Sequence, residues 1–227
     1  MKILILGATG RTGKHILEAA LARKIKTNCL VRSTKKIRAF IPNDSFTVYV
    51  GSPDKMEDLE KAAKGCDTII SVLNISRTSD FPWSTLRTPT TFLSDVMKNI
   101  LTIANAENSS LNSVISCSAW GVHETIHHIP WWFRLMINYS NIGAAYEDHE
   151  RQENLLSKSE NVKWVIVRPV GLINRKKVKR ICVSFDNNPK PNMTISRREL
   201  AQFILDIATN ERDYWYQKPT ISSSFFG

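Results

Sequence analysis

The opening of the chain places a glycine-rich turn directly after a short apolar run. Residues 2–6 read KILIL and residues 7–13 read GATGRTG. The apolar run is typical of a buried strand, because it is short and rich in branched side chains. Residues 11–23 then carry apolar side chains at helical spacing. A strand, a glycine turn and a helix in this order predict a βα unit whose backbone can approach a ligand closely.

The glycine spacing in this turn suits a diphosphate group. We expect Gly7 to form the turn, Gly10 to allow close approach of a pyrophosphate, and Gly13 to let the helix pack on the strand. The start of the helix supplies free N–H groups and a favourable dipole. Because G-x-x-G-x-x-G is a weak motif alone, a purely structural turn is the alternative. The predicted dinucleotide contacts are Gly7, Thr9, Gly10, Arg11, Thr12 and Gly13.

The end of the next predicted strand indicates which dinucleotide would bind. Sites that prefer NAD usually carry an acidic residue there, about 20 residues after the glycines. This strand instead ends CLVRS, with Arg32 and Ser33. Guanidinium groups bind phosphate through paired hydrogen bonds, so Arg11 and Arg32 suit a 2′-phosphate. We predict NADP(H) in preference to NAD(H); the alternative is that these are solvated surface charges.

Apolar segments of strand type alternate with amphipathic segments along most of the chain. Further strands are predicted at residues 26–31, 46–50, 67–73, 113–117 and 162–167, and helices at 34–40, 54–64, 86–108 and 143–157. The sequence SRRE at 196–199 is a capping box before another apolar run. This alternation predicts an α/β, Rossmann-like, doubly wound and mostly parallel sheet with helices on both faces. Residues 170–227 would add short strands and a helix.

Composition limits the remaining possibilities. A chain of 227 residues, 42% hydrophobic, can bury one core, so we expect a single domain over residues 1–227. No apolar run approaches the length of a membrane span, and the first apolar run is too short for a signal peptide. The cysteines lack metal-ligand spacing, so we expect no metal and free thiols in a cytoplasmic protein. The net charge of +10 fits an anionic ligand, but does not by itself exclude nucleic acid or a membrane surface.

Several segments resemble a known family. They are ILGATGRTG, LVRS, VGSPD, GCDTIISVL, SCSAW, DHERQENLL, VKWVIVRPVGL and ISRRELAQF. In this order they resemble the NAD(P)-binding, NmrA-like atypical short-chain dehydrogenase/reductases, nearest the biliverdin reductase B/flavin reductase group. The resemblance implies cofactor contacts in four further places: Ser52 in the adenine loop, Leu73 and Asn74 after the fourth strand, Cys117 and Ser118 beside the nicotinamide, and Pro169 and Val170 on its other side.

The acid–base pair of the wider superfamily is absent. Ketone and alcohol dehydrogenases of that superfamily carry Tyr-x-x-x-Lys, but here His149 stands near the lysine position and Ala145 four residues before it. Tyr146 is one position off and would point elsewhere on a helix. The resemblance implies that Ser118 and His149 are the catalytic candidates, with His149 binding phosphate or ribose or donating a proton. An ordinary, partly buried histidine is the alternative.

Two other stretches bear on the substrate. We expect the substrate side to be built from about residues 119–145 and 170–195, with Trp120, Trp131 and Trp132 stacking on a flat ring. The aromatic segment could instead be a lid on the core or a dimer contact. The basic run RKKVKR at 175–180 is interpreted as a solvated face, or else as the entrance of the substrate site, where it would attract anionic substrates. No nucleic-acid-binding motif accompanies it.

The sequence thus favours an NADPH-dependent oxidoreductase that transfers hydride to a small planar acceptor of the flavin or quinone type. Such acceptors need orientation more than a strong acid. The alternative is a non-catalytic, NmrA-like NADP(H) sensor, and a sugar-nucleotide epimerase is disfavoured by the missing Tyr–Lys pair. We expect a monomer or homodimer with no nucleic-acid or membrane partner.

Overall fold

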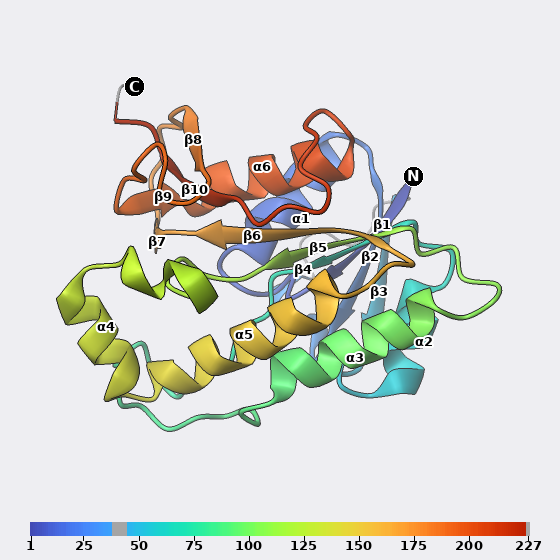
Figure 1. Cartoon of the computed structure of the whole chain (residues 1–227). Coiled ribbons are helices and arrows are strands. Elements are labelled where there is room, and N and C mark those ends of the chain that lie inside the picture. The colour runs from blue at the N-terminus through green and yellow to red at the C-terminus, as the bar shows by residue number, and fades with distance from the viewer. Residues whose placement is uncertain (38–44, 226–227) are drawn as a thin grey trace.

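The apolar runs of the sequence lie side by side as a mostly parallel sheet (Figure 1). The computed structural model describes residues 1–37 and 45–225. The sheet has eight strands in the order β3-β2-β1-β4-β5-β6-β10-β8, and only β8 runs antiparallel to its neighbour. The strands are β1 (Lys2–Leu6), β2 (Lys26–Val31), β3 (Phe46–Val50), β4 (Thr68–Ser71), β5 (Ser113–Cys117), β6 (Lys163–Pro169), β8 (Ile181–Ser184) and β10 (Thr220–Ser223). Two short strands, β7 (Gly171–Ile173) and β9 (Thr194–Ser196), pair separately.

Helices cover both faces of the sheet (Figure 1). One face carries α1 (Gly13–Ala22) and α6 (Arg197–Ala208), which contact each other. The other carries α2 (Met56–Ala63), α3 (Phe92–Ala104) and α5 (Ile142–Ser157), and α4 (Trp131–Asn138) packs against α5. Single 3-10 segments lie at Thr34–Lys36 and His123–His127. Among the described residues, no helix is long and apolar enough to cross a bilayer.

Strand β1 shows why both faces are covered. Ile3 and Ile5 belong to the core under α1 and α6, whereas Leu4 and Leu6 belong to the core under α2, α3 and α5. All four side chains are fully buried. A strand that is apolar on both faces needs a layer of helices on each, as in parallel sheets of α/β proteins.

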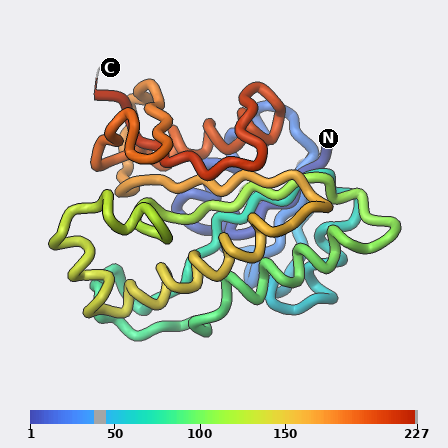
Figure 2. Tube along the Cα trace, viewed as in Figure 1, coloured from blue at the N-terminus to red at the C-terminus, as the bar shows by residue number. Residues whose placement is uncertain are grey.

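The strand order reverses direction at β1. From β1 the chain runs outward through β2 to β3, then returns to β4 on the other side of β1 and continues to β6. This confirms the predicted doubly wound, Rossmann-like fold, which creates a crevice where the order reverses, at the carboxyl ends of the strands. The carboxyl-terminal part of the chain folds back beside the first helix (Figure 2). The predicted capping box, Ser196 with Glu199, is confirmed at the start of α6.

Two predicted helices differ from those observed. Helix α3 begins at Phe92, not at residue 86. Pro89 disfavours helical geometry at the residue before it, and the buried carboxylate of Asp148 fixes the start of the helix by accepting from the Leu93 amide at 2.6 Å and the Ser94 hydroxyl at 2.6 Å. The predicted helix at 34–40 is a single 3-10 turn, and its residues 38–40 lie outside the described part of the chain.

Removing the Asp148 carboxylate should destabilise the fold. Asp148→Ala leaves the amino end of α3 without its buried acceptor, so the free energy of unfolding should fall by about 2–3 kcal/mol. Urea unfolding followed by circular dichroism measures the change. Glu147→Ala is the control, because that exposed neighbour forms only a surface pair with Arg151 and should lose under about 0.5 kcal/mol. Equal losses for the two variants would contradict the capping role.

Candidate functional site

A cleft of about 620 Å³ lies at the carboxyl ends of the central strands, where the strand order reverses. Most of its lining comes from the turn after β1 and from the segment after β4. Two residues come from the end of β5, and one each comes from the end of β2 and from α5, β7 and α6. The lining residues are Gly7, Thr9, Gly10, Arg11, Thr12, Arg32, Val72, Leu73, Asn74, Ile75, Ser76, Arg77, Thr78, Ser79, Asp80, Cys117, Ser118, His149, Leu172 and Arg197.

The turn after β1 can be built only from glycine at two positions. Gly7 has a φ of +88°, in the region that side chains disfavour. Gly13 lies beneath the turn rather than in the cleft, and a Cβ there would stand 2.1 Å from the Gly7 carbonyl oxygen. Any other residue would push α1 away from β1. The sequence therefore forces the start of α1 against the end of the first strand.

This packing leaves backbone donors free at the cleft. The Gly10 amide donates to the Gly7 carbonyl at 2.9 Å, and the Lys14 amide donates to that of Gly10 at 3.0 Å. The amides of Arg11 and Thr12 have no acceptor within the described chain. The first turn of α1 carries no acidic residue. Free amides at the positive end of a helix are the usual environment of a bound phosphate.

Four guanidinium groups line the cleft: Arg11, Arg32, Arg77 and Arg197. Arg11 forms a bidentate ion pair with Asp80, with N–O distances of 2.9 and 2.8 Å, and so ties the segment after β4 to the glycine turn. The Arg11 hydrogen bond and charge lower the pKa of Asp80. Arg32 is exposed at the end of β2 and makes no ion pair with the described residues. One arginine is thus fixed by a carboxylate and another is free for an anion.

Ser118 and His149 are buried polar groups that also line the cleft. They are 5% and 4% exposed, and neither the Ser118 hydroxyl nor the His149 Nδ1 has a hydrogen-bond partner in the structure described. Burial lowers the pKa of His149 to about 4, although the charges of Glu153 and Asp148 oppose the shift. The ring is therefore neutral at pH 7. Buried polar atoms without partners are uncommon in proteins, and here they face a ligand-sized space.

Cys117 lies beside Ser118 in the lining. Burial raises the pKa of its thiol to about 12, so the thiol stays protonated at neutral pH. A protonated thiol is a poor nucleophile. Cys117 therefore contributes shape to the cleft rather than a reactive thiolate.

Five of the predicted cofactor contacts lie outside the lining: Gly13, which lies beneath the turn, and Ser33, Ser52, Pro169 and Val170. The Ser33 hydroxyl accepts from the Lys35 amide at 3.4 Å and caps the 3-10 turn. Ser52 donates its amide to Asp58 at 3.0 Å and its hydroxyl to Asp54. Pro169 and Val170 are buried at the end of β6.

The predicted substrate tryptophans also lie outside the cleft lining. Trp120 is 7% exposed and belongs to the core, whereas Trp131 and Trp132 are 68% and 51% exposed on α4. Tyr146 donates its hydroxyl to the Trp120 carbonyl at 3.3 Å, and burial raises the pKa of this phenol. Tyr146 is absent from the cleft lining as well. The cleft therefore holds no tyrosine, in agreement with the missing Tyr–Lys pair.

Sequence reasoning missed part of the lining. Residues 75–80, Leu172 and Arg197 were not anticipated. The position of 75–80 could have been inferred, because any segment that follows a central strand begins at the carboxyl edge of the sheet. Arg197 is the first residue of α6, and only the folding of that helix onto α1 brings it to the site.

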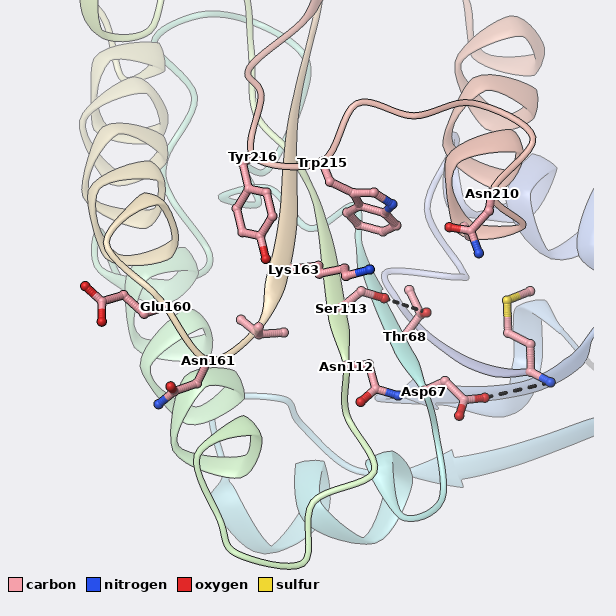
Figure 3. A pocket seen from close by; sticks show the side chains of 13 residues that line it. Asp67, Thr68, Asn112, Ser113, Glu160, Asn161, Lys163, Asn210, Trp215 and Tyr216 are labelled. Atoms are coloured by element: carbon pink, nitrogen blue, oxygen red, sulfur yellow. Dashed lines mark hydrogen bonds and ion pairs between the residues drawn. The ribbon is translucent and has the colours of Figure 1, made fainter.

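A second cavity, of about 660 Å³, lies at the opposite end of the sheet (Figure 3). Its lining comes from the amino ends of β4, β5 and β6 and from the segment after α6. Two of the polar groups there bond to each other, the Thr68 and Ser113 hydroxyls, at 2.8 Å. Ligands of open α/β sheets bind at the carboxyl ends of the strands. This cavity is therefore not the candidate site.

Comparison with known proteins identifies a family for this chain. The model of a family described as NAD(P)H-binding matches residues 7–211. The chain belongs to this NAD(P)H-binding family. That match confirms the predicted NAD(P)-binding family.

Solved structures share the fold. A short-chain dehydrogenase/reductase from Veillonella parvula, solved with NADP, has a TM-score of 0.78 at 16% identity, covering 99% of this chain and 95% of that one. ChuY, an anaerobilin reductase from Escherichia coli O157:H7, has a TM-score of 0.76 at 17% identity, covering 100% and 99%. A Rossmann-fold NAD(P)-binding protein from Shigella flexneri gives 0.71 at 18%, covering 99% and 94%.

Loss of the Asp80 carboxylate should favour the phosphorylated coenzyme. Asp80→Asn frees Arg11 and removes a negative charge from the cleft, so NADPH should bind about two- to five-fold more tightly. NADH lacks the 2′-phosphate, and its affinity should change little. Fluorescence titration of the two coenzymes measures both values. An equal gain for NADH would show that Arg11 does not act on the 2′-phosphate.

Proposed function

We propose that this protein is an NADPH-dependent oxidoreductase that transfers a hydride to a small planar acceptor of the flavin or quinone type. The observation that carries the proposal is the pair of buried, unpartnered polar groups, Ser118 and His149, in a cofactor cleft that holds no tyrosine. This arrangement can orient a ring but offers no strong acid. The description of one similar structure, ChuY, as a reductase supports the same class of reaction.

The preference for NADPH follows from the charges of the cleft. Its lining contains four arginines and one carboxylate, and that carboxylate, Asp80, is already paired with Arg11. Residues 32–37, the described residues directly after β2, include no acidic residue, although a ribose with free hydroxyls would need an acceptor there. Arg32 at that position suits the 2′-phosphate instead.

Arg32→Ala should lower the affinity for NADPH by about 10- to 100-fold, as expected for the loss of a charge-assisted hydrogen bond. The affinity for NADH should stay within about two-fold, since NADH has nothing for Arg32 to bind. Isothermal titration calorimetry measures both coenzymes. Lys35→Ala is the matched control, because it removes a nearby positive charge that does not line the cleft. If Arg32→Ala leaves the affinity for both coenzymes unchanged, or lowers both equally, the assignment of Arg32 to the 2′-phosphate is contradicted.

The reaction needs orientation from the protein more than proton transfer. The bound nicotinamide would supply the hydride, and water would supply the accompanying proton to a flavin or quinone. Ser118, at the end of β5, can bond to the cofactor amide or to the acceptor. His149 is neutral at pH 7 because burial lowers its pKa to about 4, so it can bond as a neutral ring. Both side chains would hold the two rings in contact while the cleft excludes water.

Turnover assays test the proposal directly. NADPH oxidation should be observed with FMN, FAD or a quinone, and Ser118→Ala and His149→Ala should each lower kcat/KM by about ten-fold through loss of one orienting hydrogen bond. Ser116→Ala is the control, because its hydroxyl is also buried and unpartnered but does not line the cleft. Its kcat/KM should match that of the wild type. If NADPH is oxidised with none of the flavin and quinone acceptors, the proposal is wrong.

A non-catalytic NADP(H) sensor is the second candidate. The observation that favours it is the exposed aromatic surface of α4, where Trp131, Trp132 and Leu135 are 68%, 51% and 46% exposed and could contact a partner. A redox sensor must distinguish the two oxidation states of its coenzyme. Measured affinities for NADP⁺ and NADPH that differ strongly, together with no turnover, would favour the sensor over the reductase.

We also propose a cytoplasmic protein. The four cysteines, at positions 29, 66, 117 and 182, are all unpaired. Free thiols are typical of the reducing cytoplasm, where NADPH is available as a reductant. A monomer or homodimer with its substrate side formed by residues 119–145 and 170–195 remains our prediction for the assembly.

A further inference from the structure

A strongly basic groove of about 520 Å³ adjoins the cofactor cleft. Three segments that are far apart in the sequence form it: the start of α1, the residues after β7, and the first turn of α6. Its lining residues are Arg11, Lys14, His15, Asn174, Arg175, Lys176, Arg197 and Arg198. Six of these eight are arginine or lysine, and none is acidic.

One carboxylate behind the groove holds its shape. Glu199 is fully buried and accepts from Arg175 at 2.6 Å and from the Lys179 amide at 2.7 Å. Arg175 also donates to the Ser223 hydroxyl at 2.7 Å. Arg175 is therefore a fixed guanidinium, not a mobile one in solvent. The first part of the basic run at 175–180 forms a wall of the groove, so its interpretation as a purely solvated face does not describe Arg175.

The charge of the groove is only partly balanced by ion pairs: Arg11, Lys14 and Arg175 pair with Asp80, Glu18 and Glu199. Arg197 donates only to a neutral partner, the Asn174 side chain, at 3.0 Å. Burial and the nearby charge of Arg11 lower the pKa of Arg197, although the charge of Asp80 opposes the shift. Lys176 and Arg198 are exposed and make no ion pair with other described residues. Lys176, Arg197 and Arg198 thus form a cluster of cations without ion-pair partners among the described residues, and such a cluster favours the binding of an anion.

The groove overlaps the predicted 2′-phosphate site at Arg11 but not at Arg32. Arg32, which follows β2, lines the cofactor cleft but not the groove. Arg11 and Arg197 line both. An anion held by the residues that line only the groove would therefore lie beside the coenzyme, and it would share Arg11 and Arg197 with the coenzyme cleft.

We propose that this groove is a second ligand site, which binds a phosphate-bearing small molecule with two or more negative charges while the coenzyme is bound. Guanidinium forks from α6 and from the segment after β7 suit phosphate oxygens, and a volume of about 520 Å³ admits a diphosphate group. The phosphate belongs either to the acceptor, as a tail that reaches out of the cleft, or to a separate effector.

Calorimetric titration of the NADPH-saturated protein with inorganic pyrophosphate tests the site. Lys176→Glu/Arg198→Glu should weaken pyrophosphate binding by about ten-fold or more, because both residues line the groove and neither lines the cofactor cleft. Lys64→Glu/Lys158→Glu is the matched control, since it makes the same charge change at exposed positions elsewhere. Its affinity should stay within about two-fold of the wild type. Thermal unfolding checks that both double variants are folded.

Three results would overturn the proposal: no binding of pyrophosphate to the wild type at about 1 mM, equal weakening in the control variant, or stoichiometric displacement of NADPH by pyrophosphate. The titration is repeated without coenzyme, so that failure to bind NADPH is distinguished from failure of the groove. Comparison of FMN with riboflavin as acceptors identifies the source of the phosphate. If kcat/KM is higher for FMN than for riboflavin, and Lys176→Glu/Arg198→Glu removes the difference, the groove binds the phosphate of the acceptor. If kcat/KM is the same for both acceptors and the wild type still binds pyrophosphate, the groove binds a separate effector.

Discussion

The close contact between the start of α1 and the end of β1 is the constraint on which the site depends. A Cβ at Gly13 would stand 2.1 Å from the Gly7 carbonyl oxygen, so no larger residue allows the helix to approach. This approach places Arg11 and Thr12, whose amides have no acceptor among the described residues, in the lining of the cleft. Because the strand order reverses beside β1, the same point is also where segments from β4, β5 and α6 converge. Backbone geometry and topology thus create one binding place.

The segment between β4 and α3 couples this place to the rest of the molecule. Asp80 in that segment is paired with Arg11 of the glycine turn, and Trp83 donates its ring N–H to the Tyr139 carbonyl at 2.8 Å, just after α4. The segment therefore bridges the coenzyme cleft and the exposed aromatic helix. Asp80 and a 2′-phosphate would compete for Arg11, so this segment is in contact with a residue predicted to bind the coenzyme. Such a link would serve either a reductase that orders its acceptor site or a sensor that signals to a partner.

The sequence predicted the parts that local patterns determine. Four features were predicted correctly because each depends on residues close together in the chain. They are the apolar runs of the strands, the glycine turn, the basic end of β2 and the capping box of α6. The start of α3 was not predicted correctly, since it is fixed by Asp148, which lies 55 residues from Leu93 in the sequence. Asp80, Arg77 and Arg197 joined the site only through the packing of distant segments. Burial of His149, which makes its ring neutral, likewise follows from tertiary packing.

A crystal structure of the protein grown with saturating NADPH is the most direct measurement of this account. It should place the diphosphate within hydrogen-bond distance of the Arg11 and Thr12 amides, and the 2′-phosphate against Arg32. If the diphosphate of the coenzyme lies away from the glycine turn, or if the turn stays empty at saturation, the claim that this turn binds the coenzyme is contradicted.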